Sequence, residues 1–222
     1  TSASSSISVV AAPPPPPPPP PPAGNTVMFR QGTDGYASAL DLGVSNQYVQ
    51  YNGGKGVVSN DAVSGAYRIA GAGGYEVRSL LRFGGLEALR GKRVTRAELV
   101  LNFNFGASGY TLDGRYLAKP WKPTDSGFGW TRRDNINRWA AAGSGGTDWL
   151  PNKAFTISGF TGAQADLRTL QLDLAVVQGW IDNPASNQGL VLRPTVAGKV
   201  SWLRSGEDPQ ASLRPTLKLW LE

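Results

Sequence analysis

Residues 96–105 carry the pattern that most restricts how this chain can fold. Small or apolar side chains occupy alternate positions, and polar side chains separate them except at Val100. The alternating inner set is Ala97, Leu99, Leu101, Phe103 and Phe105. Because side chains alternate between the two faces of a strand, this pattern predicts a long β-strand with one buried face. Such a strand needs a second layer to cover it, which favours a β-sandwich.

A second strand is predicted just before this one. Val77, Leu81 and Phe83 alternate with Arg78 and Arg82, although Leu80 interrupts the alternation, and two glycines end the run. The chain has 28 glycines and 17 prolines and lacks a long helical pattern. This composition favours many short antiparallel strands joined by turns, an all-β fold in residues 25–222.

One short helix is predicted after residue 173. Val176, Val177, Trp180 and Ile181 recur at helical spacing before Pro184, and Asp173 stands where an N-cap residue is expected. This spacing places Trp180 in the core.

The N-terminal residues differ from the rest of the chain. Residues 1–12 are rich in serine and alanine, and we expect them to be disordered. Ten consecutive prolines follow, from Pro13 to Pro22. They predict a polyproline II linker over residues 13–24, a stiff spacer about 30 Å long. A docking site for an aromatic groove is the alternative. Because the chain begins at Thr1, we expect it to be part of a longer protein.

Four motifs, in order, resemble the DNRLRE domain, the group that includes carbohydrate-binding module family 96. They are RSLLRF at 78–83 with the alternating strand, the tryptophan-rich segment around Trp121 and Trp130, WIDNPASNQGLVL at 180–192, and SGE at 205–207 with RPTLKL at 214–219. The resemblance covers residues 26–222. It implies a jelly-roll β-sandwich of antiparallel strands that binds glycan without catalysis. Such modules belong to secreted polysaccharide-degrading enzymes or cell-wall proteins.

Aromatic and basic residues are interleaved between residues 110 and 150. Flat rings stack on sugar rings, and arginine binds hydroxyl or carboxylate groups beside them. Several of these tryptophans could instead be core residues. From their polar surroundings we predict that the ligand-binding residues lie in loops at the rim of the sandwich. These residues are Tyr116, Trp130, Trp139, Trp149, Arg132, Arg133 and Arg138.

The net charge of +6 comes from the middle of the chain. Residues 78–138 hold twelve basic and five acidic groups, whereas residues 139–222 hold seven of each. This excess favours an anionic partner, and we predict an acidic polysaccharide. A solvated basic strand face is the alternative. We expect no membrane partner, because no apolar run is long enough to cross one.

The sequence argues against most enzyme chemistry. It has no histidine and no cysteine, which excludes a Ser-His-Asp triad, a Cys-His pair and histidine-ligated metals. We therefore predict a module that is not an enzyme and needs no cofactor. A structural calcium could bind Asp34, Asp41 and Asn46, but their spacing matches no calcium-loop motif, and turn formation is the favoured explanation.

The sequence thus predicts a monomeric, secreted module, extracellular or in a cell wall, that attaches further domains of its parent protein to a polysaccharide. Two alternatives keep the fold: a structural matrix or wall module without glycan affinity, and an accessory domain of a polysaccharide lyase. Nucleic-acid binding ranks last, and we do not expect that partner.

Overall fold

The structure is a computed structural model that describes residues 25–46, 57–58, 66–70 and 76–222. The disordered segment predicted for residues 1–12 and the polyproline linker predicted for residues 13–24 lie outside the described residues. No helix in the described residues is long and apolar enough to cross a membrane.

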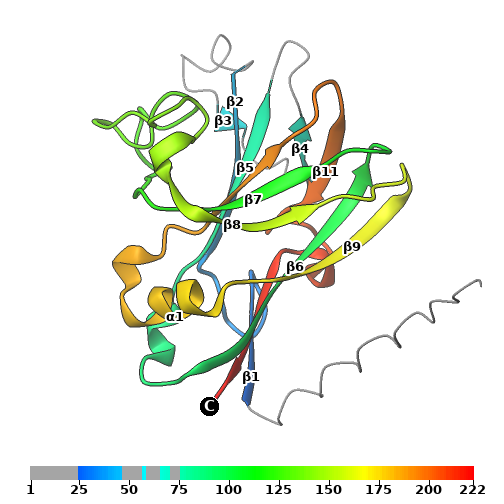
Figure 1. Ribbon diagram of the computed structural model, residues 1–222. Coiled ribbons are helices and arrows are strands. Elements are labelled where there is room, and N and C mark those ends of the chain that lie inside the picture. Colours follow the sequence, from blue (N-terminus) through cyan, green and yellow to red (C-terminus); the bar gives the residue numbers. More distant parts are fainter. Residues whose placement is uncertain (1–24, 47–56, 59–65, 71–75) are drawn as a thin grey trace, which may run out of the picture.

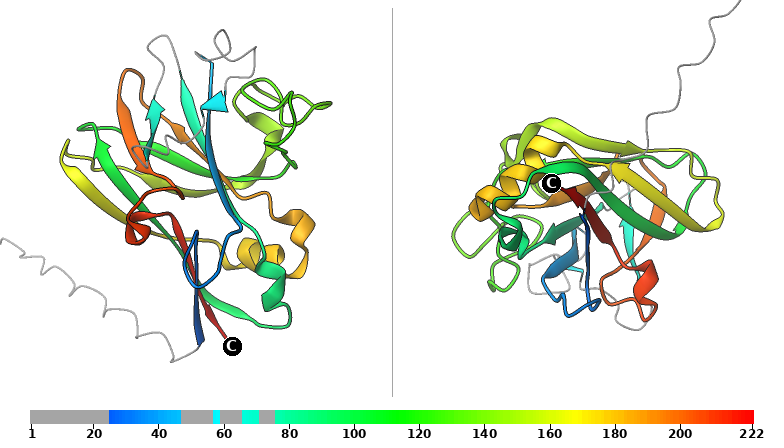
Figure 2. Two further views of the ribbon diagram at one scale, coloured as in Figure 1. Left: turned by 180° about the vertical axis from the view of Figure 1, so that it is seen from behind. Right: turned by 90° about the horizontal axis from the view of Figure 1, so that it is seen from below.

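The described residues form a mostly β structure in which two antiparallel five-strand sheets pack as a sandwich (Figures 1 and 2). The first sheet has the order β2-β5-β10-β7-β8, with the short β3 beside β2. In the second sheet, β6 pairs with β9 along one edge and with β12 and β11 along the other, and β1 lies beyond β12. β4 pairs with β11 and touches β5 at Val77. The β-sandwich prediction is therefore confirmed, whereas the jelly-roll topology stays a prediction.

The bounds of the elements are as follows. The strands are β1 (Asn25–Arg30), β2 (Ala39–Ser45), β3 (Val57–Val58), β4 (Ala66–Ala70), β5 (Val77–Phe83), β6 (Val94–Gly106), β7 (Leu112–Leu117), β8 (Trp149–Ile157), β9 (Gln164–Gln171), β10 (Leu190–Pro194), β11 (Val200–Arg204) and β12 (Thr216–Leu221). The α-helix is α1 (Leu174–Asp182), and the 3-10 turns are η1 (Leu86–Leu89), η2 (Gly146–Asp148), η3 (Pro184–Ser186) and η4 (Ala211–Leu213).

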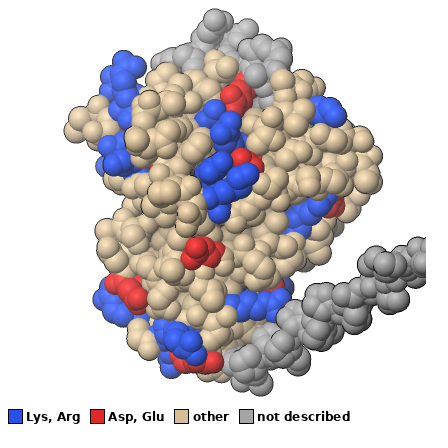
Figure 3. Space-filling model, viewed as in Figure 1, with Lys and Arg blue, Asp and Glu red and all other residues tan. Residues whose placement is uncertain are grey.

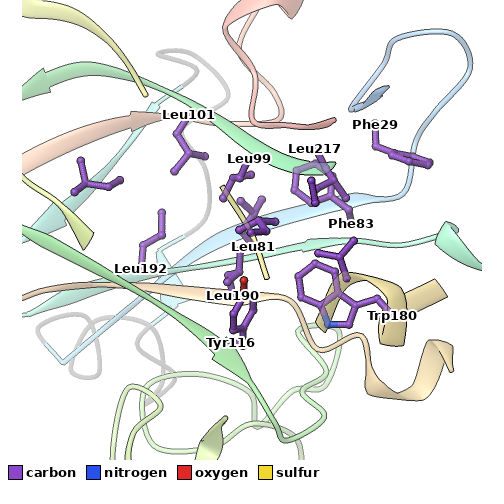
Figure 4. Packing of buried hydrophobic residues seen from close by; sticks show 14 of the residues in the cluster. Phe29, Leu81, Phe83, Leu99, Leu101, Tyr116, Trp180, Leu190, Leu192 and Leu217 are labelled. Atoms are coloured by element: carbon purple, nitrogen blue, oxygen red, sulfur yellow. The ribbon is translucent and has the colours of Figure 1, made fainter. Parts of the chain in front are cut away.

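The core lies between the two sheets and takes its side chains from the inner face of each strand (Figure 4). The first four alternating residues of β6, Ala97 to Phe103, are fully buried there. Phe105 does not follow them. The pairing of β6 with β11 shifts, so that Leu203 faces Phe103 and the residue before it, Trp202, faces Phe105. Because paired residues share a face, this bulge turns Phe105 to the outer side with Trp202.

Helix α1 closes one end of this core. Asp173 caps it by accepting hydrogen bonds from the backbone N–H groups of Ala175 and Val176. Trp180 is buried and packs edge-on against Tyr116, with ring centroids 5.9 Å apart. The predicted helix, its cap and the core position of Trp180 are therefore confirmed.

Candidate binding surface

Residues 118–148, which join β7 to β8, cover part of the outer face of the first sheet; we call this segment the tryptophan loop. The outer side chains of the sheet beneath it are apolar, so they need a cover. Together they form a second hydrophobic cluster, separate from the core between the sheets. Its buried members are Leu42, Val44, Leu80, Leu117, Trp121, Phe128, Trp130, Trp139 and Val191.

This cluster overturns part of the predicted site. Trp130 and Trp139 are only 8% and 5% exposed, so the prediction that they stand open at a rim is wrong. The Trp139 indole N–H donates to the carbonyl of Gly129 at 2.9 Å, so it points back into the loop. Tyr116 is 1% exposed inside the sandwich, where its hydroxyl accepts from the Asp173 N–H at 2.7 Å. These three rings have no face open to a glycan.

The predicted arginines of the loop bind the loop itself. Arg132 donates to the carbonyls of Asn135 and Ile136, at 3.2 and 3.3 Å. Arg133 donates to the carbonyl of Pro120 at 2.7 Å. Arg138 is exposed, and its backbone pairs with that of Arg132. The first two side chains therefore stabilise a turn, and only Arg138 remains open to solvent.

Trp149 is the predicted ring that contacts two cations, whereas the buried Trp130 contacts, among the described residues, only Arg78, at 5.3 Å. It is partly buried at the start of β8, and its indole N–H donates to the Ser144 hydroxyl at 2.9 Å. The guanidinium carbons of Arg115 and Arg193 lie 5.5 and 5.2 Å from its ring centroid. Cations at this distance from an indole ring are attracted by it. Trp149 thus positions two arginines from neighbouring strands.

The strands of the first sheet bring four cations together on this outer face; we call Arg78, Arg115, Lys153 and Arg193 the cationic patch. Arg193 follows Leu192, which pairs with Ser79, so it lies beside Arg78 across β10 and β5. Arg193 also pairs with Asp113 of β7, two residues before Arg115. Lys and Arg atoms gather on this side of the molecule, over the area of β7 and β8 (Figure 3).

Three of the four cations already have acceptors. Arg78 pairs with Glu76 at 2.7 Å and donates to the carbonyls of Gly143 and Ser144. Arg115 and Lys153 share the carboxylate of Asp113, at 3.4 and 3.0 Å. Burial alone would raise the pKa of Asp113, but its bonds to Lys153 and Thr156 hold that pKa below its usual value.

Arg193 is the exception. Its guanidinium has no acceptor among the described residues, and its Nε is buried without a partner. Burial, and then the charge of Arg78, lower the pKa of Arg193, while Glu76 and Asp113 act in the opposite direction. A partly buried cation beside another cation is electrostatically unfavourable until an anion joins it. This arrangement can bind a carboxylate or sulfate through two parallel hydrogen bonds.

The predicted calcium ligands do not form one site. Asp41 lies inside β2, where the Gly206 N–H donates a hydrogen bond to both of its carboxylate oxygens, each at 3.1 Å. Asn46 accepts from the Glu76 N–H at 2.7 Å. Five positions along an extended chain separate these two residues by about 16 Å. The described residues contain no cluster of three acidic side chains suited to a metal ion.

Part of the cationic patch is predictable from local sequence. Arg78 and Arg115 fall at outward positions of their strands, but nothing local indicates that Arg193 joins them, because β10 reaches β5 and β7 only through long-range pairing.

No protein-family model and no curated protein matches this chain. The family resemblance therefore stays a prediction from the sequence motifs.

Proposed function

We propose that this chain is a non-catalytic module that binds an acidic polysaccharide through the cationic patch. The observation that carries the proposal is Arg193, a partly buried guanidinium with no acceptor among the described residues and a second arginine beside it. A carboxylate or sulfate group of a glycan would accept hydrogen bonds from the terminal N–H groups of this guanidinium. Trp149, which is only partly buried, would contact the adjoining sugar ring.

The proposal keeps the predicted biological setting: a secreted module of jelly-roll type that attaches a larger protein to its substrate or to a cell wall. It changes the predicted site. The binding residues move from the buried rings and the loop arginines to Arg193, Arg78, Arg115, Lys153 and Trp149.

A structural wall module without glycan affinity is the second candidate. It is favoured by the burial of Trp130 and Trp139, which that alternative predicts to be packing residues. It does not explain why Arg193 lacks an acceptor among the described residues.

Calorimetry against alginate, pectin, a sulfated galactan and a neutral glucan tests the proposal. We expect binding to at least one acidic polymer and none to the neutral glucan. Arg193→Ala should weaken that binding about tenfold, the effect of losing one charged hydrogen-bonding group. Arg96→Ala is the matched control, because Arg96 lies 4.6 Å over the Trp220 ring but is paired with Glu98 in the other sheet. Absence of binding to every acidic polymer would refute the proposal.

A further inference from the structure

Arginines that lie over aromatic rings in this structure fall into two groups. Arg78, Arg96, Arg115 and Arg168 each also pair with a carboxylate. Arg193 and Arg82 have neither an ion pair nor a hydrogen-bond acceptor among the described residues. Arg82 is not part of the cationic patch, so its missing acceptor needs its own explanation.

Arg82 is held in a fixed position. It is partly buried on β5, and its guanidinium carbon lies 4.6 Å from the centroid of the Trp121 ring. The Trp121 indole N–H donates to the carbonyl of Gln188 at 2.8 Å, which fixes that ring. Burial lowers the pKa of Arg82. Ordering and partly burying this side chain costs free energy that no acceptor in the described residues offsets.

Two residues with unsatisfied acceptors precede Gly189, which contacts Arg82. Gly189 packs against Arg82, since a Cβ built at Gly189 would be 2.8 Å from the Cβ of Arg82. The two residues before it, Asn187 and Gln188, are each 8% exposed, and each has a buried side-chain oxygen without a donor. Both oxygens are buried inside the protein, so an anionic group of a ligand would approach Arg82 from the exposed part of its side chain instead.

Arg82 and the Arg78–Arg193 pair lie on the same face of the first sheet. Arg78 and Arg82 are four residues apart on β5, a distance of about 13 Å along the strand. Leu80 and Val191 lie between the two positions, and both belong to the cluster under the tryptophan loop. One sugar ring therefore cannot contact both positions.

We propose that Arg82 is a second anion-binding position, so that the ligand is an oligomer with anionic groups on more than one unit. This inference rests on the proposed function, because it places Arg193 at the first position. Two anion-binding positions on one protein strengthen the binding of an oligomer, because binding of one anionic group raises the effective concentration of the next group at the second position.

Galacturonate oligomers of two lengths test the inference by calorimetry. The dimer can occupy the Arg193 position alone, whereas the octamer can reach both. We expect Arg82→Ala to weaken octamer binding about tenfold and dimer binding less than twofold, and Arg193→Ala to weaken both. Arg82→Gln, which keeps a polar side chain over Trp121 but removes the charge, should act like Arg82→Ala if folding is intact. Arg96→Ala should change neither affinity.

The outcomes separate the inference from the proposed function. Octamer binding that Arg82→Ala leaves unchanged, or weakens no more than dimer binding, overturns the inference while the proposed function stands. If the wild-type protein binds neither oligomer, the role proposed for Arg193 is not supported by this polymer, and inorganic sulfate tests Arg82 directly. The Nε–Hε NMR signal of Arg82 should then shift on sulfate titration, whereas the signal of Arg96 should not. Equal behaviour of the two signals overturns the inference.

Discussion

At the scale of single residues, Asp41 is the most unusual group of the sandwich. Its side chain is 5% exposed on β2. Burial, and then the charge of Glu207, raise its pKa to about 7, although the Gly206 N–H acts in the opposite direction. Folding therefore favours the protonated form of this carboxyl.

Asp41 makes the free energy of unfolding depend on pH with an unusual sign. An unfolded aspartate has a pKa of about 3.9, so between roughly pH 4 and pH 7 the native state holds the proton that the unfolded state has lost. Stability should therefore fall as the pH rises through this range and level off above it. The total change is on the order of 4 kcal/mol, from about 1.4 kcal/mol for each of roughly three units of pKa difference.

Asp41→Asn should remove most of this slope and be more stable than the wild type at pH 8. Urea unfolding at pH 4.5, 6 and 8 measures the effect. Asp34→Asn, which changes an exposed carboxylate of the turn before β2, should keep the wild-type slope. Parallel slopes in the wild type and Asp41→Asn would show that Asp41 ionises without cost in the fold.

At the scale of elements, the residues that interrupt the apolar–polar alternation of a strand show that its outer face is also buried. Leu80 breaks the pattern of β5 because both faces of that strand are buried, one in the core and one under the tryptophan loop. Val100, the exception in β6, is likewise 8% exposed on an outer face. Trp130 and Trp139 stand among polar residues, as loop residues do, so their burial could be inferred only from the apolar outer face they cover.

Other elements show what local sequence can and cannot specify. The Asp173 cap and the helical spacing around Trp180 are local signals, and both were sufficient. Phe105 leaves the inner face at a bulge that depends on β11, almost one hundred positions further along the chain. The residues of β6 alone therefore do not predict that Phe105 turns outward.

Trp139→Ala tests the role of the tryptophan loop. Removing this buried ring should lower the free energy of unfolding by about 3 kcal/mol, the usual cost of truncating a large core side chain. Trp202→Ala is the matched control, because Trp202 is 39% exposed on β11 and its loss should cost much less. Thermal and urea unfolding of both variants measure the difference. Equal losses would mean that the loop packs on the sheet without stabilising it.

At the scale of the whole molecule, the sandwich assembles a charged surface from strands that are distant in sequence. Arg78, Arg115, Lys153 and Arg193 come from β5, β7, β8 and β10, which are neighbours in the first sheet. The basic middle of the sequence predicted an anionic partner, but it did not indicate that Arg193 from the balanced C-terminal part would complete the surface.

Binding of an acidic polysaccharide should weaken steeply as salt is added. Charges on an open surface are screened over about 10 Å at 0.1 M salt and about 3 Å at 1 M. We therefore expect the affinity to decline steadily as sodium chloride is raised from about 0.05 M to about 0.5 M. The decline should be shallower for Arg193→Ala. Affinity independent of salt would indicate recognition through uncharged contacts instead.

The pairing of β1 with β12 has a consequence for engineering this protein. Asn25, the first described residue, faces Leu221 across the two strands, so residues 25 and 222 lie at the same end of the sandwich. A short peptide could connect Glu222 to Asn25, and new termini could then be opened elsewhere. A label or an immobilising tag fused at either strand would also leave from that same end, which allows both to be attached side by side.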